Sequence, residues 1–567
     1  MSLLCPTPAG SALQGIRCCA PRAARMSRVA HFTTLVDSGL GPRPASPTYN
    51  DALKYLNSLQ NNHKVLEARR KNPPKDLTKN DSLHEMLQSV EDAGYKPSEF
   101  DRLNAVHVAG TKGKGTTCAF VNSILDQYRE RYGTPKQIGL YTSPHLLSVC
   151  ERIRINSKSI SEQKFTQYFF ELWDRLEHGA HRRGADPGLK PAYFRYLTLL
   201  SLHAFVREEV DVAIYEVGVG GEFDSTNVLS KPAAVGITSL DIDHVQVLGN
   251  TVEEIAWHKA GIMKLGSPAY TVAQPQGAMK VLQKRAEEKQ VVLREVPIGR
   301  CLTNVPIFPD EDYQKTNASL AIVLASRVLD KFDLPLDARC PDVASGKGQS
   351  EQATVSLEEE LPNLFKSGLT TSLWRGRGEI VKRDYGTWYL DGAHTTASLK
   401  IVCDWFGRII HGARNEGGED SLPILIFNQQ AETRNARQLI DTVQQTLRQQ
   451  WAVQPEAAIF CSNVTYKTNE YKPDFVDSNS DPTAVETLSM QRDYSQWWKE
   501  ADPKSSTHVV RSIEEAVELA RKTCERQPER RAHILVTGTF RIVGGALAIL
   551  EGSGIATEAS TTASCSG

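Results

Sequence analysis

The sequence predicts an α/β protein built around mainly parallel β-sheet, and three features of the chain support that class. Short apolar runs of strand length alternate with stretches of helical spacing from residue 49 onward. One apolar run leads through a glycine-rich turn into a helix near residue 110. A second series of apolar runs and helical stretches follows a polar segment near residue 340. Such alternation is typical of βα units, and the polar interruption predicts two domains.

The first domain is expected over residues 46–336. Helical spacing predicts helices at Thr116–Tyr128 and Asn317–Leu329. Four apolar runs have the length and composition of strands that are buried on both faces, as a parallel sheet requires. These strands are predicted at Leu103–Ala109, Ile138–Tyr141, Val210–Val217 and Ala233–Leu240.

The second domain is expected over residues 373–567, after a polar linker or insertion at 337–372. A further polar stretch with scattered aromatic residues, 462–504, is interpreted as an insertion within this domain. Because neither 337–360 nor 462–504 carries any of the family motifs quoted below, we expect that trimming either segment to a short linker preserves activity. The strands of this domain are predicted at Thr387–Leu390, Pro423–Phe427, Ala457–Cys461 and Ile534–Val536.

The composition is that of an ordinary globular protein. Of the 567 residues, 40 % are hydrophobic and 23 % are charged, which are ordinary shares for a globular protein. The length is sufficient for more than one buried core. A formal net charge of −1 argues against binding of bulk nucleic acid, and the absence of an 18-residue apolar run argues against a transmembrane segment. The eleven cysteines form no Cys-x-x-Cys pair, which favours a reduced compartment over a zinc ribbon or a disulfide framework.

The N-terminal residues 1–45 are interpreted as a leader followed by a linker. The first 36 residues contain four arginines but no Asp, Glu or Lys, as in a mitochondrial transit peptide. A disordered tail without a targeting role is the alternative. Met26 is an internal start candidate, so we expect one mitochondrial (matrix) and one cytoplasmic product.

A glycine-rich loop between the first predicted strand and helix has the context of a phosphate-binding loop. In the stretch Ala105–Thr117, glycines let the backbone approach a polyphosphate, and the helix start presents N–H groups to it. Lys114 is expected to reach the β- and γ-phosphates, and Thr116 or Thr117 to place a hydroxyl near the phosphates or a magnesium ion. Gly115 follows Lys114, which departs from the strict P-loop pattern. An ordinary glycine-rich turn is the alternative.

The loop Gly110–Thr116 resembles the ATP loop of the Mur ligase superfamily and, more specifically, of the folylpolyglutamate synthase family. Further matches follow in the family's order from about residue 50 to the C-terminus, interrupted by the two polar stretches. They are Thr142–Leu146, Glu151–Asn156, Tyr215–Asn227, Leu240–His244, Ile255–Ile262, Trp374–Arg377 and Leu390–His394.

The resemblance implies an ATP-dependent ligase that joins L-glutamate to the γ-carboxyl of a reduced folate. It further implies an N-terminal P-loop ATPase domain and a smaller C-terminal, Rossmann-type domain like that of dihydrofolate reductase. ATP, Mg²⁺ and a monovalent cation (K⁺) are the implied cofactors, and we expect small-molecule substrates, no nucleic acid and a monomer. A dihydrofolate synthase, which adds the first glutamate to dihydropteroate, would share the ATP and metal motifs. A nucleotide-dependent switch would need the loop alone.

The chemistry of such a ligase explains why the site needs cations. A carboxylate is a poor electrophile, so transfer of the γ-phosphoryl group forms an acyl phosphate that the amine of glutamate can attack. Both steps gather negative charge, which metal ions and cationic side chains stabilise.

Residues that match the family's metal ligands lie at the ends of predicted strands. Ser143, Glu216 and His244 match its magnesium ligands, although imidazole is a less usual partner for this ion. The alternatives are that Ser143 caps a helix, that the Glu216 carboxylate is bonded to backbone, and that His244 is an ordinary loop histidine. Lys259 matches a lysine that is carbamylated in the superfamily, with a surface lysine as the alternative.

The remaining candidates come from the resemblance to the family's nucleotide and folate sites. Asn317 matches the adenine contact, although Thr316-Asn317 is also a helix-start signal. Arg377 and Asp391 match residues that complete the ATP site, with Arg375 as an alternative to Arg377, and His394 is placed in the same cleft or on an exposed loop. The predicted catalytic residues are Lys114, Lys259 and His394, and the predicted nucleotide contacts include Gly110, Thr111, Lys112, Gly113, Lys114, Gly115 and Thr116. Pro191–Arg195 resembles the segment beside the folate pocket, and Arg434 is a candidate for a glutamate carboxylate.

Overall fold

The computed structural model describes most of the chain between residues 43 and 552. The described residues are 32–33, 43–60, 81–335, 355, 357–358, 360–415, 421–430, 435–468, 474, 486–503 and 505–552. They belong to one compact unit, Phe32–Gly567. Most of the predicted leader 1–45 and of the stretch 337–360, and Arg434, lie outside the described residues.

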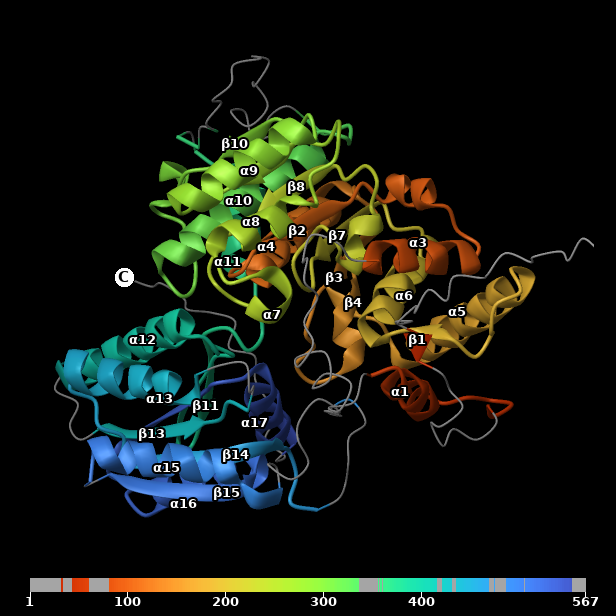
Figure 1. Ribbon diagram of the computed structural model, residues 1–567. Coiled ribbons are helices and arrows are strands. Elements are labelled where there is room, and N and C mark those ends of the chain that lie inside the picture. Colours follow the sequence, from red (N-terminus) through yellow and green to blue (C-terminus); the bar gives the residue numbers. More distant parts are fainter. Residues whose placement is uncertain are drawn as a thin grey trace, which may run out of the picture. The chain divides into compact units, whose positions relative to one another are not determined.

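The first part of this unit is organised by an eight-stranded sheet with the order β10-β9-β8-β2-β7-β3-β4-β5 (Figure 1). Neighbouring strands are parallel except where β3 pairs with β4 and β4 with β5. The strands are β2 (Val106–Ala109), β3 (Ile138–Tyr141), β4 (Ile153–Ile155), β5 (Lys158–Ser159), β7 (Val212–Glu216), β8 (Ala234–Ile237), β9 (Ala269–Thr271) and β10 (Leu293–Glu295). Separately, β1 (Phe32–Thr33) pairs with β6 (Lys190–Pro191).

Helices cover both faces of this sheet, and strand β7 shows why. Val212 and Ile214 belong to one hydrophobic core, whereas Ala213 and Tyr215 belong to another, as expected when successive side chains point to opposite faces. The helices of this part are α1 (Tyr49–Ser58), α3 (Ser82–Asp92), α4 (Lys114–Tyr132), α5 (Glu162–Arg182), α6 (Tyr193–Arg207), α7 (Val245–Leu248), α8 (Val252–Ala260), α9 (Gln276–Glu288), α10 (Asp312–Leu329) and α11 (Asn363–Thr371).

A six-stranded sheet with the order β11-β12-β16-β13-β14-β15 organises the C-terminal part. All neighbouring pairs are parallel except β11 with β12. The strands are β11 (Glu379–Arg383), β12 (Gly386–Leu390), β13 (Ser421–Phe427), β14 (Ala457–Val464), β15 (Ser506–Ser512) and β16 (Arg531–Thr537). The helices are α12 (Thr396–Asn415), α13 (Ala436–Gln445), α15 (Ser489–Ala501), α16 (Ile513–Glu525) and α17 (Phe540–Gly552).

The predicted α/β class with mainly parallel sheets is confirmed, and two predicted boundaries are corrected. The strand predicted from Leu103 begins at Val106, because Leu103 closes a short 3₁₀ helix, Pro97–Leu103. The helix predicted from Asn317 begins at Asp312, more than one turn earlier. Asn317 is therefore an internal helix residue, so its alternative as a helix-start residue is wrong. The domain boundaries stay predictions.

The interpretation of 462–504 as a dispensable insertion is wrong for its described C-terminal portion. Residues 489–501 form helix α15, whose Tyr494 and Trp498 are 0 % and 1 % exposed within the core beside β13 and β14. The indole of Trp498 also donates to the Ser505 hydroxyl at 2.9 Å. Because these side chains fill the core, removing the helix would unfold this side of the sheet.

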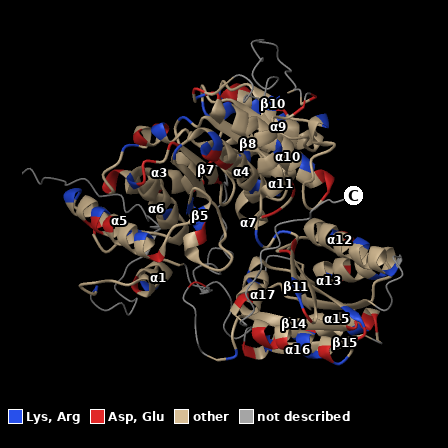
Figure 2. Cartoon of the chain, turned by 180° about the vertical axis from the view of Figure 1, so that it is seen from behind, with Lys and Arg blue, Asp and Glu red and all other residues tan. Residues whose placement is uncertain are grey.

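Charge and hydropathy agree with the composition. Figure 2 shows Lys and Arg interspersed with Asp and Glu along the helices around both sheets. Within the part of the chain that the structure describes, no helix has both the length and the apolar character needed to cross a membrane.

Candidate functional site

The loop after β2 has a backbone that glycine permits. Gly110 has a φ of +147° and Gly113 a φ of +87°. A Cβ at Gly110 would lie 1.7 Å from the Thr238 hydroxyl, and one at Gly113 would lie 2.1 Å from the amide oxygen of Asn317. Helix α4 starts at Lys114, so its first N–H groups have no partner in a preceding turn. A loop of glycines that packs this closely, followed by unpaired N–H groups at the start of a helix, fits a polyphosphate.

Thr111 and Lys112 attach the loop to the segment that follows β8. Both of their N–H groups donate to the carbonyl of Ser239, at 3.0 and 3.1 Å, and the Thr111 hydroxyl donates to the carbonyl of Asp241. The Lys112 ammonium lies 3.4 Å from the Asp243 carboxylate, and burial lowers the pKa of this lysine. These contacts leave the N–H groups at the start of α4 as the ones that can face an anion.

Two lysine side chains converge on one carbonyl oxygen of the loop. The amino group of Lys114 lies 3.1 Å from the Gly110 oxygen, and that of Lys259 lies 2.7 Å from it. Lys259 projects from α8 and is 3 % exposed. Burial, and then the neighbouring Lys114, hold the pKa of Lys259 well below its usual value. The neutral amine of Lys259 is thereby favoured.

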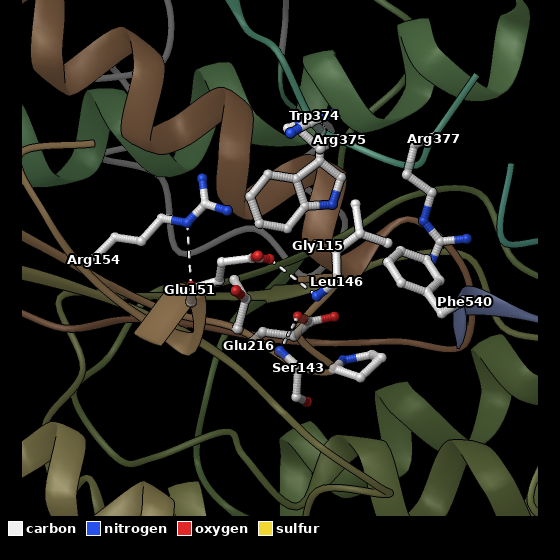
Figure 3. Close-up of a pocket in the computed structure, with 12 residues that line it drawn as sticks. Gly115, Ser143, Leu146, Glu151, Arg154, Glu216, Trp374, Arg375, Arg377 and Phe540 are labelled. Atoms are coloured by element: carbon white, nitrogen blue, oxygen red, sulfur yellow. Dashed lines mark hydrogen bonds between the residues drawn. The ribbon is translucent and has the colours of Figure 1, made fainter. Parts of the chain in front are cut away.

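Glu216 and Ser143 meet in a pocket at the ends of β7 and β3 (Figure 3). The backbone N–H of Ser143 donates to Glu216 Oε2 at 2.9 Å. Burial raises the pKa of Glu216, and the nearby Lys114 opposes that shift. We call this the Glu216 pocket; its lining includes Gly115, Ser143, Glu216, Trp374, Arg377 and Phe540. Its carboxylate and hydroxyl oxygens are donors that suit Mg²⁺.

His244 lies on the wall of a different pocket. It precedes the short helix α7 with a φ of +53°, and its neighbours in that pocket include Thr395, Thr396 and Gln438. Among the described residues, no three His, Cys, Asp or Glu side chains form a group that could hold a metal ion. The structure thus brings Ser143 and Glu216 into one pocket and places His244 in another.

Asn317 and the two threonines of the loop lie close to Gly113. The Asn317 amide approaches Gly113 from α10 and donates to the Gln314 side chain at 3.3 Å. Thr117 is fully buried, and its hydroxyl has no hydrogen-bond partner among the described residues, whereas Thr116 is partly exposed. Thr116 is therefore the better placed of the two to reach a ligand.

The two arginines of the Trp374–Arg377 motif have different partners. Arg375 pairs with Glu379 at 2.9 Å and with Glu551 at 2.6 Å. The guanidinium of Arg377 instead lies 4.2 Å from the centre of the Phe540 ring and forms no ion pair with a described residue. Arg377, the residue that the resemblance favours, is therefore the one with charge available to a ligand.

Asp391 and His394 organise the loop after β12. Asp391 accepts hydrogen bonds from the N–H groups of Gly378 and Ala393, both at 2.8 Å, and burial raises its pKa. His394 Nδ1 lies 2.8 Å from the Gly392 carbonyl, and its Nε2 lies 3.9 Å from the Asp243 carboxylate. His394 is partly buried, and Asp243 lies near both Lys112 and His394.

Several residues of the Glu216 pocket were not singled out from the sequence, among them Arg154, Trp374 and Phe540. Arg154 and Trp374 stand within motifs that carry the family resemblance, so their positions were marked without a role. Phe540 begins α17 and carries no sequence signal. Tyr193 and Phe194, in the segment Pro191–Arg195, pack against the core of α5 and α6, and Phe194 also approaches Gly218.

Comparisons with known proteins identify relatives along nearly the whole chain. A folylpolyglutamate synthase of Neurospora crassa is 46 % identical over 512 residues, which cover 89 % of this chain and 92 % of the relative. A folylpolyglutamate synthase of Saccharomyces cerevisiae is 41 % identical over 515 residues, or 90 % of this chain and 88 % of the relative. A comparison with models of protein families finds no match.

Solved structures share the fold at lower identity. The Mycobacterium tuberculosis folylpolyglutamate synthase complexed with ADP and AMPPCP has a TM-score of 0.59 at 20 % identity and covers 86 % of this chain and 98 % of its own. Escherichia coli FolC in complex with DHPP and ADP has a TM-score of 0.58 at 20 % identity, covering 90 % and 99 %. These two likenesses support the two-sheet α/β architecture.

Proposed function

This chain belongs to the folylpolyglutamate synthase family, and we propose that it adds L-glutamate to the γ-carboxyl of reduced folates through an acyl phosphate. The observation that carries the proposal is the 46 % identity to a folylpolyglutamate synthase over 89 % of the chain. The loop at Gly110–Thr116, which supplies free N–H groups and a lysine, supports the use of ATP. The relatives' name favours this activity over that of a dihydrofolate synthase.

The first proposed step transfers the γ-phosphoryl group of ATP to the γ-carboxylate of the folate. A carboxylate oxygen attacks phosphorus, the bond to the bridging oxygen of ADP breaks, and an acyl phosphate forms. Negative charge gathers as two anions meet. Gly115, at the start of α4, and Arg377 line the Glu216 pocket, and the charge of Lys114 acts on Glu216. Lys114, the N–H groups at the start of α4 and Arg377 can therefore stabilise the developing charge.

Mg²⁺, when bound, would shield the phosphate charge and polarise the transferred group. We propose that Glu216 and Ser143 hold it, with His244, which lines a different pocket, as a third candidate. A cation beside Glu216 also favours the ionised carboxylate, which burial alone disfavours.

Lys259 is proposed to be carbamylated, as its lowered pKa favours the neutral amine. The neutral amine nitrogen attacks the carbon of CO₂ and loses one proton, so that a neutral group becomes a carbamate anion beside Lys114. Exchange with isotope-labelled bicarbonate should give a carbamate NMR signal that Lys259→Ala lacks. Identical spectra for the two proteins would contradict the assignment.

The second proposed step is attack of the glutamate amine on the acyl carbon, with phosphate as the leaving group. The amine must lose a proton, and His394 is the base that we propose. Because the Gly392 carbonyl can only accept a hydrogen bond, Nδ1 of His394 donates a proton to it. We propose Nε2, on the other side of the ring, as the atom that takes the proton from the amine.

Product mass tests the function directly. Residues 40–567 are incubated with Mg-ATP, L-glutamate and either tetrahydrofolate or dihydropteroate, with Lys114→Ala as the inactive control. We expect successive glutamate additions to tetrahydrofolate. A single addition to dihydropteroate alone would assign the chain to dihydrofolate synthesis, and ATP hydrolysis without ligation would assign it to a nucleotide switch.

We further propose a monomer made in two forms, one mitochondrial from Met1 and one cytoplasmic from Met26. The arginine-bearing, acid-free stretch 1–36 supports the targeting proposal. Sequencing of the N-terminus from separated compartments should give two different ends, whereas one identical end would contradict it. Light scattering of the purified chain should give a mass near 62.8 kDa.

A further inference from the structure

Arg154 presents a cationic group to the Glu216 pocket on the side away from Arg377 (Figure 3). It stands on β4, and its Nε donates to the carbonyl of Glu151 at 3.2 Å. Its guanidinium forms no ion pair with any described residue. The terminal nitrogens of Arg154 therefore remain as donors that a ligand can use.

The carboxylate of Glu151, whose charge acts on Arg154, already accepts hydrogen bonds from the backbone. Its Oε1 accepts from the N–H groups of Leu147 and Ser148, at 2.8 and 3.0 Å, and its Oε2 accepts from that of Leu146 at 2.9 Å. Glu151 thus fixes the Leu146–Ser148 turn and does not neutralise Arg154 at close range.

Trp374 fixes the direction of Arg154. The guanidinium carbon lies 5.0 Å from the centre of the indole ring, a distance that favours a cation–π contact. A Cβ built at Gly115 would lie 3.1 Å from the indole nitrogen, so the same ring packs on the first turn of α4. Arg154 is consequently held beside the start of α4 and is not free to extend into solvent.

We propose that Arg154 binds the α-carboxylate of the terminal glutamyl residue of the folate and thereby directs ligation to its γ-carboxyl. The inference rests on the proposed function. Arg154 is then a specificity-determining residue, because it contacts a substrate group that does not react.

The partners available to each anion in the pocket favour the α-carboxylate as the group that Arg154 binds. The phosphates have Lys114, the N–H groups of α4 and Arg377 as partners. The γ-carboxylate must lie beside those phosphates, and it ceases to be a carboxylate when it is phosphorylated. The α-carboxylate is one glutamyl side chain away and stays ionised throughout, so it suits a permanent cation on the opposite wall. A planar guanidinium can bind it with two parallel hydrogen bonds.

A substrate that lacks only the α-carboxylate isolates this contact. In such a tetrahydrofolate analogue, 4-aminobutyrate replaces the glutamyl residue and the reacting carboxyl is retained. The value of kcat/KM for each substrate is measured with the wild-type protein, Arg154→Met, Arg154→Lys and Arg375→Met. Arg375 is the matched control because it lines the same pocket but pairs with Glu379 and Glu551.

We expect the wild-type protein to prefer tetrahydrofolate over the analogue by about 100-fold, since an ionic hydrogen-bonded contact is lost. Arg154→Met should reduce this preference at least about tenfold by slowing tetrahydrofolate alone. Arg154→Lys should recover part of it, and Arg375→Met should keep the wild-type ratio. Unchanged KM for ATP and an unchanged melting temperature will show that the fold and the nucleotide site are intact.

Three results would overturn the inference. One is a wild-type preference that persists in Arg154→Met. Another is a change confined to the KM of ATP, which would assign Arg154 to the phosphates, and the third is a change confined to the KM of L-glutamate, which would assign it to the incoming amino acid. If the wild-type protein ligates neither folate, the proposed function itself fails, and that result is distinct from the other three.

Discussion

The basic side chains beside the loop Gly110–Thr116 and those in the Glu216 pocket are positioned by different means. Beside the loop, Lys114 and Lys259 both approach the Gly110 carbonyl, so the backbone of one short loop fixes both amino groups. In the pocket, Arg377 rests on Phe540, a ring that begins the C-terminal helix α17. The first arrangement depends on local chain geometry. The second depends on packing between segments far apart in the sequence.

The largest expected effect concerns the packing of the second sheet. Trp498→Ala should lower the free energy of unfolding by about 3–5 kcal/mol, because it empties a fully buried site in the core of the six-stranded sheet. Denaturant titration of the purified proteins measures this change. Trp497→Ala is the matched control, since Trp497 is only partly buried and should cost far less. Equal losses for the two variants would contradict the placement of α15 in the core.

The same contrast explains what could be predicted from the sequence. The α/β class, the loop at Gly110–Thr116 and its place before a helix follow from hydrophobic period and glycine spacing, which are local properties. The core position of α15 could not be predicted from the sequence. Its two buried aromatic residues stand in a mostly polar stretch, and the residues that they contact lie on β13 and β14. Phe540 was missed for the same reason, since its contact with Arg377 exists only in the folded chain.

The next largest effect concerns the lysines of the loop Gly110–Thr116 and the rate of ligation. Lys114→Ala should reduce kcat by about 10²- to 10³-fold, because it removes a fixed cation from developing phosphate charge. Lys112→Ala in the same loop should cost much less, since the ammonium of Lys112 faces Asp243. Steady-state ligation assays compare them, and the melting temperatures show whether the loop remains folded. Near-normal turnover of Lys114→Ala would mean that the loop does not act on phosphate.

A smaller effect separates the two arginines of the Trp374–Arg377 motif. Arg377→Met should reduce kcat/KM for ATP by about 10²-fold, because its guanidinium is free of ion pairs with described residues and faces the pocket. Arg375→Met removes a charge that already pairs with Glu379 and Glu551, so we expect less than about a tenfold loss. The same ATP titration measures both variants. A larger loss for Arg375→Met would reverse the assignment.

The smallest expected effect comes from the contact between the Phe540 ring and Arg377, measured as its contribution to kcat/KM for ATP. Phe540→Leu keeps an apolar side chain under the guanidinium but removes the π face, a contact worth about 0.5–1 kcal/mol. We therefore expect kcat/KM for ATP to fall about two- to fivefold, with Phe540→Tyr close to the wild-type value. If Phe540→Leu costs as much as Arg377→Met, the ring does more than support the charge: it would then be required to place Arg377 at all. If it costs nothing, the guanidinium is positioned by the loop that carries it, and both sets of basic side chains are positioned by the same means.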